Sequence, residues 1–160
     1  MYSVKRVKIW DISNLHKIVK ILYKCGKDMA NEKDLHHWDN SMIKTWAIVF
    51  LCALKNCVYL VLFDKIPVAT FQTRRLGNAL LFQKLATLPS FSGRGIGAFC
   101  LNEIEQLAKD LHCDEVVCEV YDKSEHAITF YENRGYVVYG ETSTIKYKEL
   151  KLRKSFKETE

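Results

Sequence analysis

The 160-residue sequence contains little proline and glycine, with two Pro and seven Gly. This scarcity excludes collagen-like and low-complexity chains, and the 48% hydrophobic and 27% charged residues are typical of a globular protein that folds on its own. A chain of this length is expected to form one domain. We predict that this domain covers residues 1–154 and that residues 155–160 form a frayed polar tail.

The sequence also lacks a long apolar stretch. Its longest apolar run, Trp46–Leu54, has about nine residues, whereas a membrane-spanning helix needs ~20. The first ten residues carry Lys5, Arg6 and Lys8, and no apolar region follows them, so they do not have the form of a secretory signal. We therefore expect a soluble, cytoplasmic protein with no membrane partner.

Paired cysteine motifs are absent as well. The sequence has six cysteines, and no two of them have the two-residue spacing of a zinc or redox motif. A chain with an ample core does not need disulfides, so we expect free thiols in a reducing compartment and no metal site.

Charge of one sign is only slightly in excess. The 24 Lys and Arg residues exceed the 19 Asp and Glu residues by five, which favours anionic ligands but falls short of a dedicated nucleic-acid binder. No nucleic-acid partner is expected, and the composition allows either a monomer or a homodimer.

Hydrophobic periodicity predicts strands that alternate with helices. We expect an edge strand over 4–10, a helix from Asp11 or Ser13 to Cys25-Gly26, and a loop with a short helix over 27–40. A further helix is expected over 41–55, with an apolar face that holds Ile43, Phe50 and Leu54. Further strands are expected over 57–63, 67–75, 80–87, 115–121, 137–144 and 144–152, and further helices over 95–111 and 124–133. This order predicts a single α/β domain with a mixed, splayed central sheet flanked by helices on both faces.

A glycine-rich segment follows the strand expected over 80–87. It reads Ser92-Gly93-Arg94-Gly95-Ile96-Gly97-Ala98 and opens the next helix. Such glycines free consecutive backbone N–H groups to point at one anion, and the helix N-terminus adds partial positive charge at the same place. Arg94 adds a full charge nearby, so phosphate is the predicted ligand.

Two other interpretations of these glycines exist. They could form only a tight strand-to-helix turn, or Gly93, Gly95 and Ala98 could belong to a dinucleotide fingerprint, with Glu119 about twenty residues on. The second is opposed by Pro89 and the residues after it, which separate the glycines from the strand. A Walker-type phosphate loop is excluded because no Gly-Lys-Ser/Thr follows.

A second cluster lies one strand further along the chain. Together, Leu88-Pro89-x-Phe91-Ser92-Gly93-Arg94-Gly95-Ile96-Gly97 and Ala127-x-x-Phe130-Tyr131-x-x-x-Gly135-Tyr136 resemble the two central motifs of the GNAT superfamily of acyl-CoA-dependent N-acetyltransferases. This resemblance implies a GNAT-like fold, acetyl-CoA as cosubstrate, and an amine of a small molecule or protein as acceptor.

The resemblance also implies which residues bind the cofactor. Backbone N–H groups of Gly93, Arg94, Gly95, Ile96, Gly97 and Ala98 would hold the pyrophosphate of coenzyme A, and Thr87 and Leu88 would pair with the pantetheine amides. Ser92 and Ser124 stand where the family usually has Gln or Arg and often has Asn, respectively, beside the cofactor. A backbone N–H of Thr87 or Leu88, freed by a bulge, would polarise the acetyl carbonyl.

Catalysis by direct attack needs a proton donor for the departing thiolate and a base for the amine. Tyr131 is the expected general acid, because a tyrosine hydroxyl ordinarily has a pKa of about 10 and is protonated at neutral pH. Glu119 alternates with Cys118 and Val120 and is the candidate base, although a solvated charge and water-relayed deprotonation remain alternatives. The family's carboxylate before the glycine loop is absent.

The segment between the first two expected helices often lines the acceptor pocket in this family. Here it contains His37, Trp38 and Asp39, which we expect to supply a proton relay, an apolar wall and an anionic anchor for a cationic amine. Two rival functions remain at this point: an acyl-CoA sensor without turnover, since no clear base is visible, and a dinucleotide-dependent oxidoreductase.

Overall fold

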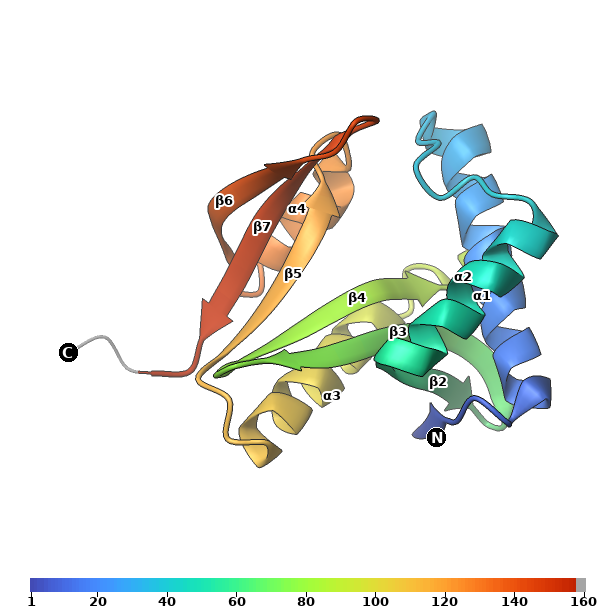
Figure 1. Cartoon of the computed structure of the whole chain (residues 1–160), viewed down its shortest axis with the longest axis horizontal. Helices are drawn as coiled ribbons and strands as arrows, with labels where there is room; N and C mark the ends of the chain where they lie inside the picture. The colour runs from blue at the N-terminus through green and yellow to red at the C-terminus, as the bar shows by residue number, and fades with distance from the viewer. Residues whose placement is uncertain (158–160) are drawn as a thin grey trace. The chain divides into compact units, whose positions relative to one another are not determined.

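The structure, a computed structural model, describes residues 1–157 and divides into two compact units (Figure 1). The first unit comprises Met1–Arg74 and Lys84–Glu103, and the second comprises Arg75–Gln83 and the chain from Ile104 onward. Of the tail predicted over 155–160, residues 158–160 lie outside the described residues.

Strands and helices follow one another in the predicted order. The elements are β1 (Tyr2–Val7), α1 (Ile12–Lys33), α2 (Met42–Lys55), β2 (Cys57–Phe63), β3 (Ile66–Leu76), β4 (Ala79–Thr87), the short 3-10 helix η1 (Pro89–Phe91), α3 (Ile96–Asp110), β5 (Glu115–Tyr121), α4 (Glu125–Glu132), β6 (Val137–Ser143) and β7 (Lys148–Ser155). Within residues 1–157 the strands form a seven-stranded sheet in the order β1-β2-β3-β4-β5-β7-β6. The sheet is mixed, because β4 and β5 are parallel while β1 and β2 are antiparallel. The predicted α/β class with a mixed sheet is confirmed.

Helices cover both faces of the sheet in the first unit. Val58 and Leu60 of β2 belong to a core cluster with α1 residues such as Ile18, on one face. Alternate strand residues point to the opposite face, where Tyr2 stacks on Phe99 of α3 with 4.8 Å between ring centroids. The strands between them are therefore buried on both sides.

Helix α1 is longer than predicted. It begins after Asp11, whose side chain accepts the N–H of Asn14, as expected. The predicted end at Cys25-Gly26 is wrong, because the helix continues to Lys33 and ends at Asp34 in a left-handed conformation. Gly26 has a different role: a Cβ at this position would collide with the carbonyl oxygen of Trp38. Glycine thus lets the loop of residues 34–41 lie directly on α1.

Helix α2 has the predicted bounds but buries a different face. Its first turn is capped by Ser41, whose hydroxyl accepts the N–H of Lys44. The expected apolar face is largely in solvent, with Ile43 84% exposed, whereas Thr45 and Val49 are buried. The helix is apolar nearly all round, so its periodicity alone did not determine which side packs against α1.

Strand β4 contains a left-handed residue. Lys84 has a φ of 50°, a value that non-glycine residues rarely adopt and that, within a strand, is typical of a bulge. The parallel ladder with β5 spans Ala79–Leu81, before this residue. A bulge bends the strand and changes the direction of the side chain at that point.

A polar network stabilises the second unit. The carboxylate of Glu105 in α3 accepts a hydrogen bond from the hydroxyl of Tyr136 at 3.2 Å and pairs with the ammonium of Lys154 at 2.9 Å. Burial, and next the charge of Glu105, raise the pKa of the Tyr136 hydroxyl. Strand β7 begins at Lys148, later than predicted, because the N–H of Thr144 donates to Tyr147 in a turn between β6 and β7.

The six cysteines are free thiols, as predicted. In the part of the chain that the structure describes, no helix is both long and apolar enough to span a membrane.

Candidate functional site

The glycine segment forms a turn between β4 and α3 that requires glycine at two positions. After η1, Gly93 and Gly95 have φ values of 75° and 77°, in the left-handed region where a side chain is strained. A Cβ built at either residue would meet no atom within 4 Å. Backbone conformation therefore requires the glycines, and the space beside them is open.

Helix α3 presents its first turn at this segment. The carbonyl of Gly95 accepts the N–H of Phe99 at 3.0 Å, which makes Gly95 the residue that precedes the helix. The N–H groups of Ile96, Gly97 and Ala98 belong to the first turn, where no acceptor exists within the helix. The side chain of Ile96 is buried and anchors this end. The arrangement suits an anion.

Arg94 supplies a full positive charge to the same segment. Its guanidinium carbon lies 5.0 Å from the ring centroid of Phe91, in a cation–π contact. Ser92, also exposed, donates its N–H to the carbonyl of Pro89 at 3.0 Å. These contacts tie the segment to η1, so the charge of Arg94 stays beside the glycines.

The end of β4 differs from the expectation in one detail. The N–H of Leu88 donates to the carbonyl of Val68 in β3 at 2.8 Å, so the free N–H expected at Leu88 is not observed. Adjacent strand residues direct their N–H groups to opposite edges, so the N–H of Thr87 points away from β3. The carbonyl of Thr87 accepts the thiol of Cys25 at 3.1 Å, and burial raises the pKa of that thiol to about 12.

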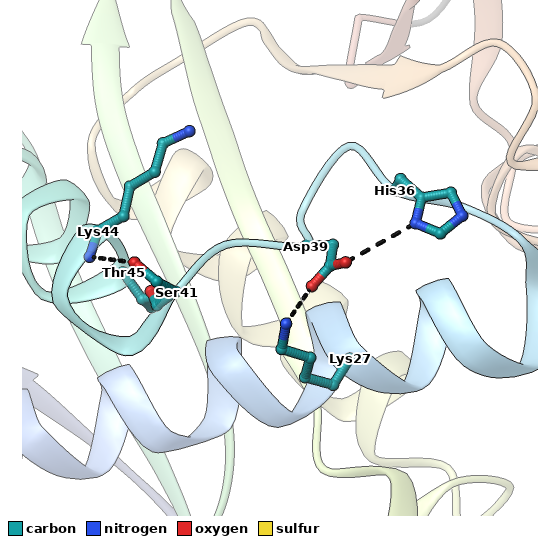
Figure 2. Close-up of polar contacts among 6 residues, drawn as sticks. All are labelled: Lys27, His36, Asp39, Ser41, Lys44 and Thr45. Atoms are coloured by element: carbon teal, nitrogen blue, oxygen red, sulfur yellow. Dashed lines mark hydrogen bonds and ion pairs between the residues drawn. The ribbon is translucent and has the colours of Figure 1, made fainter.

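The loop of residues 34–41 is held against α1 by charged contacts (Figure 2). The Asp39 carboxylate is hydrogen-bonded to the Lys27 ammonium at 2.5 Å, and its second oxygen lies 3.7 Å from Nδ1 of His36. Nε2 of His36 lies 2.8 Å from the carboxylate of Asp34. The predicted anionic anchor, Asp39, thus already has a cation of this chain beside it.

Trp38 contacts the side chain of Lys84 in β4, and His37 feels the charge of the same lysine. The Lys84 ammonium lies 5.3 Å from the ring centroid of Trp38. Burial, and next the positive charge of Lys84, lower the pKa of His37 to about 4, so its imidazole is neutral at pH 7. Lys84 was not among the residues predicted for the site. The only signal was the adjacent polar pair Gln83-Lys84, which interrupts the alternation of an otherwise apolar strand.

Tyr131, Ser124 and Glu119 belong to the second unit. Tyr131 is 8% exposed, and its ring lies 5.7 Å from that of Phe82 in β4 and 5.8 Å from that of Tyr136. Ser124 is buried and precedes α4 without a side-chain capping bond. Glu119 is exposed on β5, opposite Lys151 of β7. Aromatic packing thus fixes the Tyr131 ring, whereas Glu119 faces solvent.

Comparison with known proteins identifies a family model. The model described as the acetyltransferase (GNAT) family matches residues 15–136. No curated protein matches the sequence significantly.

Solved structures with the same fold cover the whole chain. PaiA N-acetyltransferase of Thermoplasma acidophilum, in complex with coenzyme A, aligns with a TM-score of 0.77 and 13% identity over 98% of this chain and 99% of its own. The ribosomal-protein-S18-alanine N-acetyltransferase of Escherichia coli aligns with a TM-score of 0.73 and 14% identity over 100% of this chain and 97% of its own. An aminoglycoside 6'-acetyltransferase type Ii aligns with a TM-score of 0.74 and 12% identity over 99% of each chain. At these identities the likeness shows the fold.

The adjacent residues His36 and His37 are predicted to affect stability with opposite dependence on pH. The pKa of His37 is lowered to about 4 from 6.5, so the unfolded chain binds more protons than the folded chain between these values, and stability falls on acidification through this range. Asp34, and to a smaller extent Asp39, raise the pKa of His36, so its contribution is present below pH 6.5 and lost as pH rises through the raised value.

Urea unfolding of two variants across this pH range measures the difference. His37→Gln should reduce the acid loss of stability between about pH 6.5 and pH 4. His36→Gln should lower stability relative to the wild type in mildly acidic solution and much less at alkaline pH. Parallel pH profiles for the two variants would contradict the assigned environments.

Proposed function

Because the chain belongs to the GNAT acetyltransferase family, we propose that it transfers an acetyl group from acetyl-CoA to a primary amine of a small molecule or protein. Family membership makes it an acetyl-CoA-dependent acyltransferase. The observation that carries the proposal for this chain is the glycine segment, which combines two left-handed glycines, the first turn of α3 and the positive charge of Arg94.

The glycine segment suits the phosphates of coenzyme A in three respects. The first-turn N–H groups supply hydrogen-bond donors, and the helix N-terminus supplies partial positive charge. The open space beside Gly93 and Gly95 allows a phosphate to approach the backbone. Arg94 adds a full positive charge in the same segment. From there the pantetheine arm would follow β4, where the Thr87 N–H points away from β3.

The transfer converts a neutral amine and a thioester into an amide and a thiol. The amine nitrogen forms a bond to the acetyl carbonyl carbon, the carbon–sulfur bond breaks, and the sulfur takes up one proton while the nitrogen loses one. In our proposal Tyr131 gives the sulfur its proton and afterwards regains one from the acceptor nitrogen through water, so that protons balance over the cycle. Acetyl-CoA supplies the activated acetyl group when bound.

Support for Tyr131 comes from its surroundings and from its motif. Its ring is held among Phe82, Phe130 and Tyr136, so the hydroxyl has a defined position at the end of a rigid side chain. A general acid needs such a position more than it needs an unusual pKa. Ser124, at the start of the same helix, remains the predicted partner of the cofactor in this unit.

The base that receives the acceptor's proton is less defined. Glu119 stays a prediction, and its exposure beside Lys151 favours a relay through water over direct abstraction. His37, neutral at pH 7, and Trp38 remain the predicted acceptor side in the first unit. Asp39 stays a predicted acceptor contact, although its carboxylate is shared with Lys27.

One observation favours a second candidate, an acyl-CoA sensor without turnover. The strand before the glycine segment carries Leu81 and Gln83 where some family members have a catalytic carboxylate, and neither accepts a proton from an ammonium group. The oxidoreductase hypothesis has lost its support, because the glycine segment belongs to the acetyltransferase match.

Replacement of Gly97 separates cofactor binding from backbone strain. Gly97 lies inside α3 and, unlike Gly95, has no positive φ, so Gly97→Val should leave stability nearly unchanged, since valine is at least as good a helix former as glycine. Its side chain would enter the phosphate path and weaken coenzyme A binding about tenfold or more, the value of one charge-assisted hydrogen bond. Calorimetric titration with coenzyme A measures the loss.

The matched control is Asn102→Val, which places the same side chain on an exposed position of the same helix. Asparagine and valine have similar helix propensities. Equal coenzyme A affinity in Gly97→Val and Asn102→Val would mean that the glycine segment is only a turn.

Tyr131→Phe tests the proton donor. The change removes one oxygen and keeps the ring among its aromatic neighbours, so packing should change little. General acid catalysis typically contributes about 10²–10⁴-fold, so kcat for thiol release should fall within that range while coenzyme A affinity changes much less.

The outcomes distinguish three roles for Tyr131. An unchanged kcat in the folded variant would remove it from catalysis, and a joint collapse of kcat and coenzyme A affinity would make it a positioning residue for the cofactor. A wild-type protein that binds acetyl-CoA and acetylates no amine in a broad panel would support the sensor.

A further inference from the structure

Lys84 is the one residue of β4 that combines a strained backbone with a charged side chain. Its left-handed φ of 50° costs free energy relative to an ordinary extended residue, and the strand could form without it. The bend directs the side chain to the loop of residues 34–41, where the ammonium lies 5.3 Å from the Trp38 ring centroid. Strain of this kind within a sheet is commonly kept where it positions a functional group.

The charge of Lys84 has no carboxylate partner among residues 1–157. The carboxylate that follows Trp38 in the loop, Asp39, is hydrogen-bonded to Lys27 and close to His36. The imidazole of His37 is neutral at pH 7, because burial and, next, the positive charge of Lys84 lower its pKa to about 4. Lys84 is only partly exposed, so water screens this charge incompletely. The surroundings of Lys84 are therefore suited to an anion.

The position of Lys84 along β4 relates it to the reacting end of the cofactor, and this step rests on the proposed function. If the phosphates bind at the glycine segment and the pantetheine arm passes Thr87, the arm runs backward along β4. Lys84 lies three residues before Thr87, about 10 Å along a strand. The acyl end of the arm therefore approaches Lys84, and all these residues belong to the first unit.

We propose that Lys84 binds a carboxylate of the acceptor while Trp38 packs against the apolar part of the acceptor. The preferred acceptor is then a small amine that also carries a carboxylate. An ammonium–carboxylate pair at a partly exposed site orients the acceptor, and its amine is then presented to the acetyl carbon. The same positive charge disfavours the acceptor's own ammonium form, which assists loss of its proton. A polycationic acceptor is repelled.

Matched pairs of acceptors test this specificity. Acetylation of glycine and glycinamide, and of β-alanine and its amide, is measured for the wild type, Lys84→Met and Lys84→Arg. The ratio of kcat/KM for acid over amide is compared between proteins, so that intrinsic differences in amine basicity cancel. Methionine keeps an unbranched side chain against Trp38 and removes only the charge. Lys20→Met, on an exposed position of α1, is the matched control.

The expected result is a fall in the acid-to-amide ratio of about 10- to 100-fold in Lys84→Met, the range for a lost hydrogen bond to a charged group. Lys84→Arg should retain most of the preference, and Lys20→Met all of it. An unchanged ratio in Lys84→Met, or a wild-type preference for amides or diamines, would overturn the proposal.

An equilibrium measurement keeps this test separate from that of the proposed function. NMR titration of the same acids and amides into the protein without acetyl-CoA reports acceptor binding alone. Carboxylate-dependent binding that Lys84→Met abolishes supports the proposed binding site. If the wild type shows this binding and yet acetylates no amine, the proposed acetyl transfer is wrong and the binding site is still supported. Equal binding of acids by wild type and Lys84→Met overturns it.

Discussion

The left-handed conformation of Lys84 is the constraint on which both parts of the first unit's candidate site depend. It bends β4 in the middle of a strand, at a cost of about 1–2 kcal/mol for a non-glycine residue. Beyond the bend, Leu88 returns to the ladder through its bond to Val68 and delivers the chain to the glycine segment. At the bend itself, the ammonium is carried to Trp38 and the loop of residues 34–41. One strained residue thus positions the approach to the phosphate site and the charge beside the predicted acceptor.

Two positive charges that have no carboxylate partner among residues 1–157 lie in β4 and shortly after it. After the strand, Arg94 and the first turn of α3 lie beside two glycines with open space, and within the strand the Lys84 ammonium lies over the Trp38 ring. In the loop of residues 34–41 the charges are paired, because Asp39 contacts Lys27 and His36, and these contacts hold the loop in place. The paired charges of the loop therefore stabilise the site, whereas Lys84 and Arg94 are available to ligands. The net charge of +5 is consistent with anionic ligands.

Sequence patterns predicted the elements closely wherever local signals decided them. The strands over 57–63 and 115–121 have their predicted bounds, and Asp11 caps the first helix as expected. Predictions failed where a contact distant in sequence decided the outcome. Gly26 was predicted to end a helix, yet it lies within α1, where the absence of a side chain leaves room for the Trp38 carbonyl. The predicted apolar face of α2 remains exposed. The glycine segment was found because its chemistry is local, whereas Lys84 was missed because its role depends on a bend and on a loop more than forty residues away.

The central claim is that the glycine segment binds coenzyme A, and thermal unfolding with competing ligands measures it most directly. A ligand that binds only the folded state stabilises it by RT ln(1 + [L]/Kd), about 2.7 kcal/mol at a hundredfold excess over Kd. Coenzyme A and acetyl-CoA should raise the Tm of the wild-type protein accordingly, and NAD at the same concentration should raise it much less. No shift with coenzyme A, or a larger shift with NAD, would contradict an acyltransferase site at this segment.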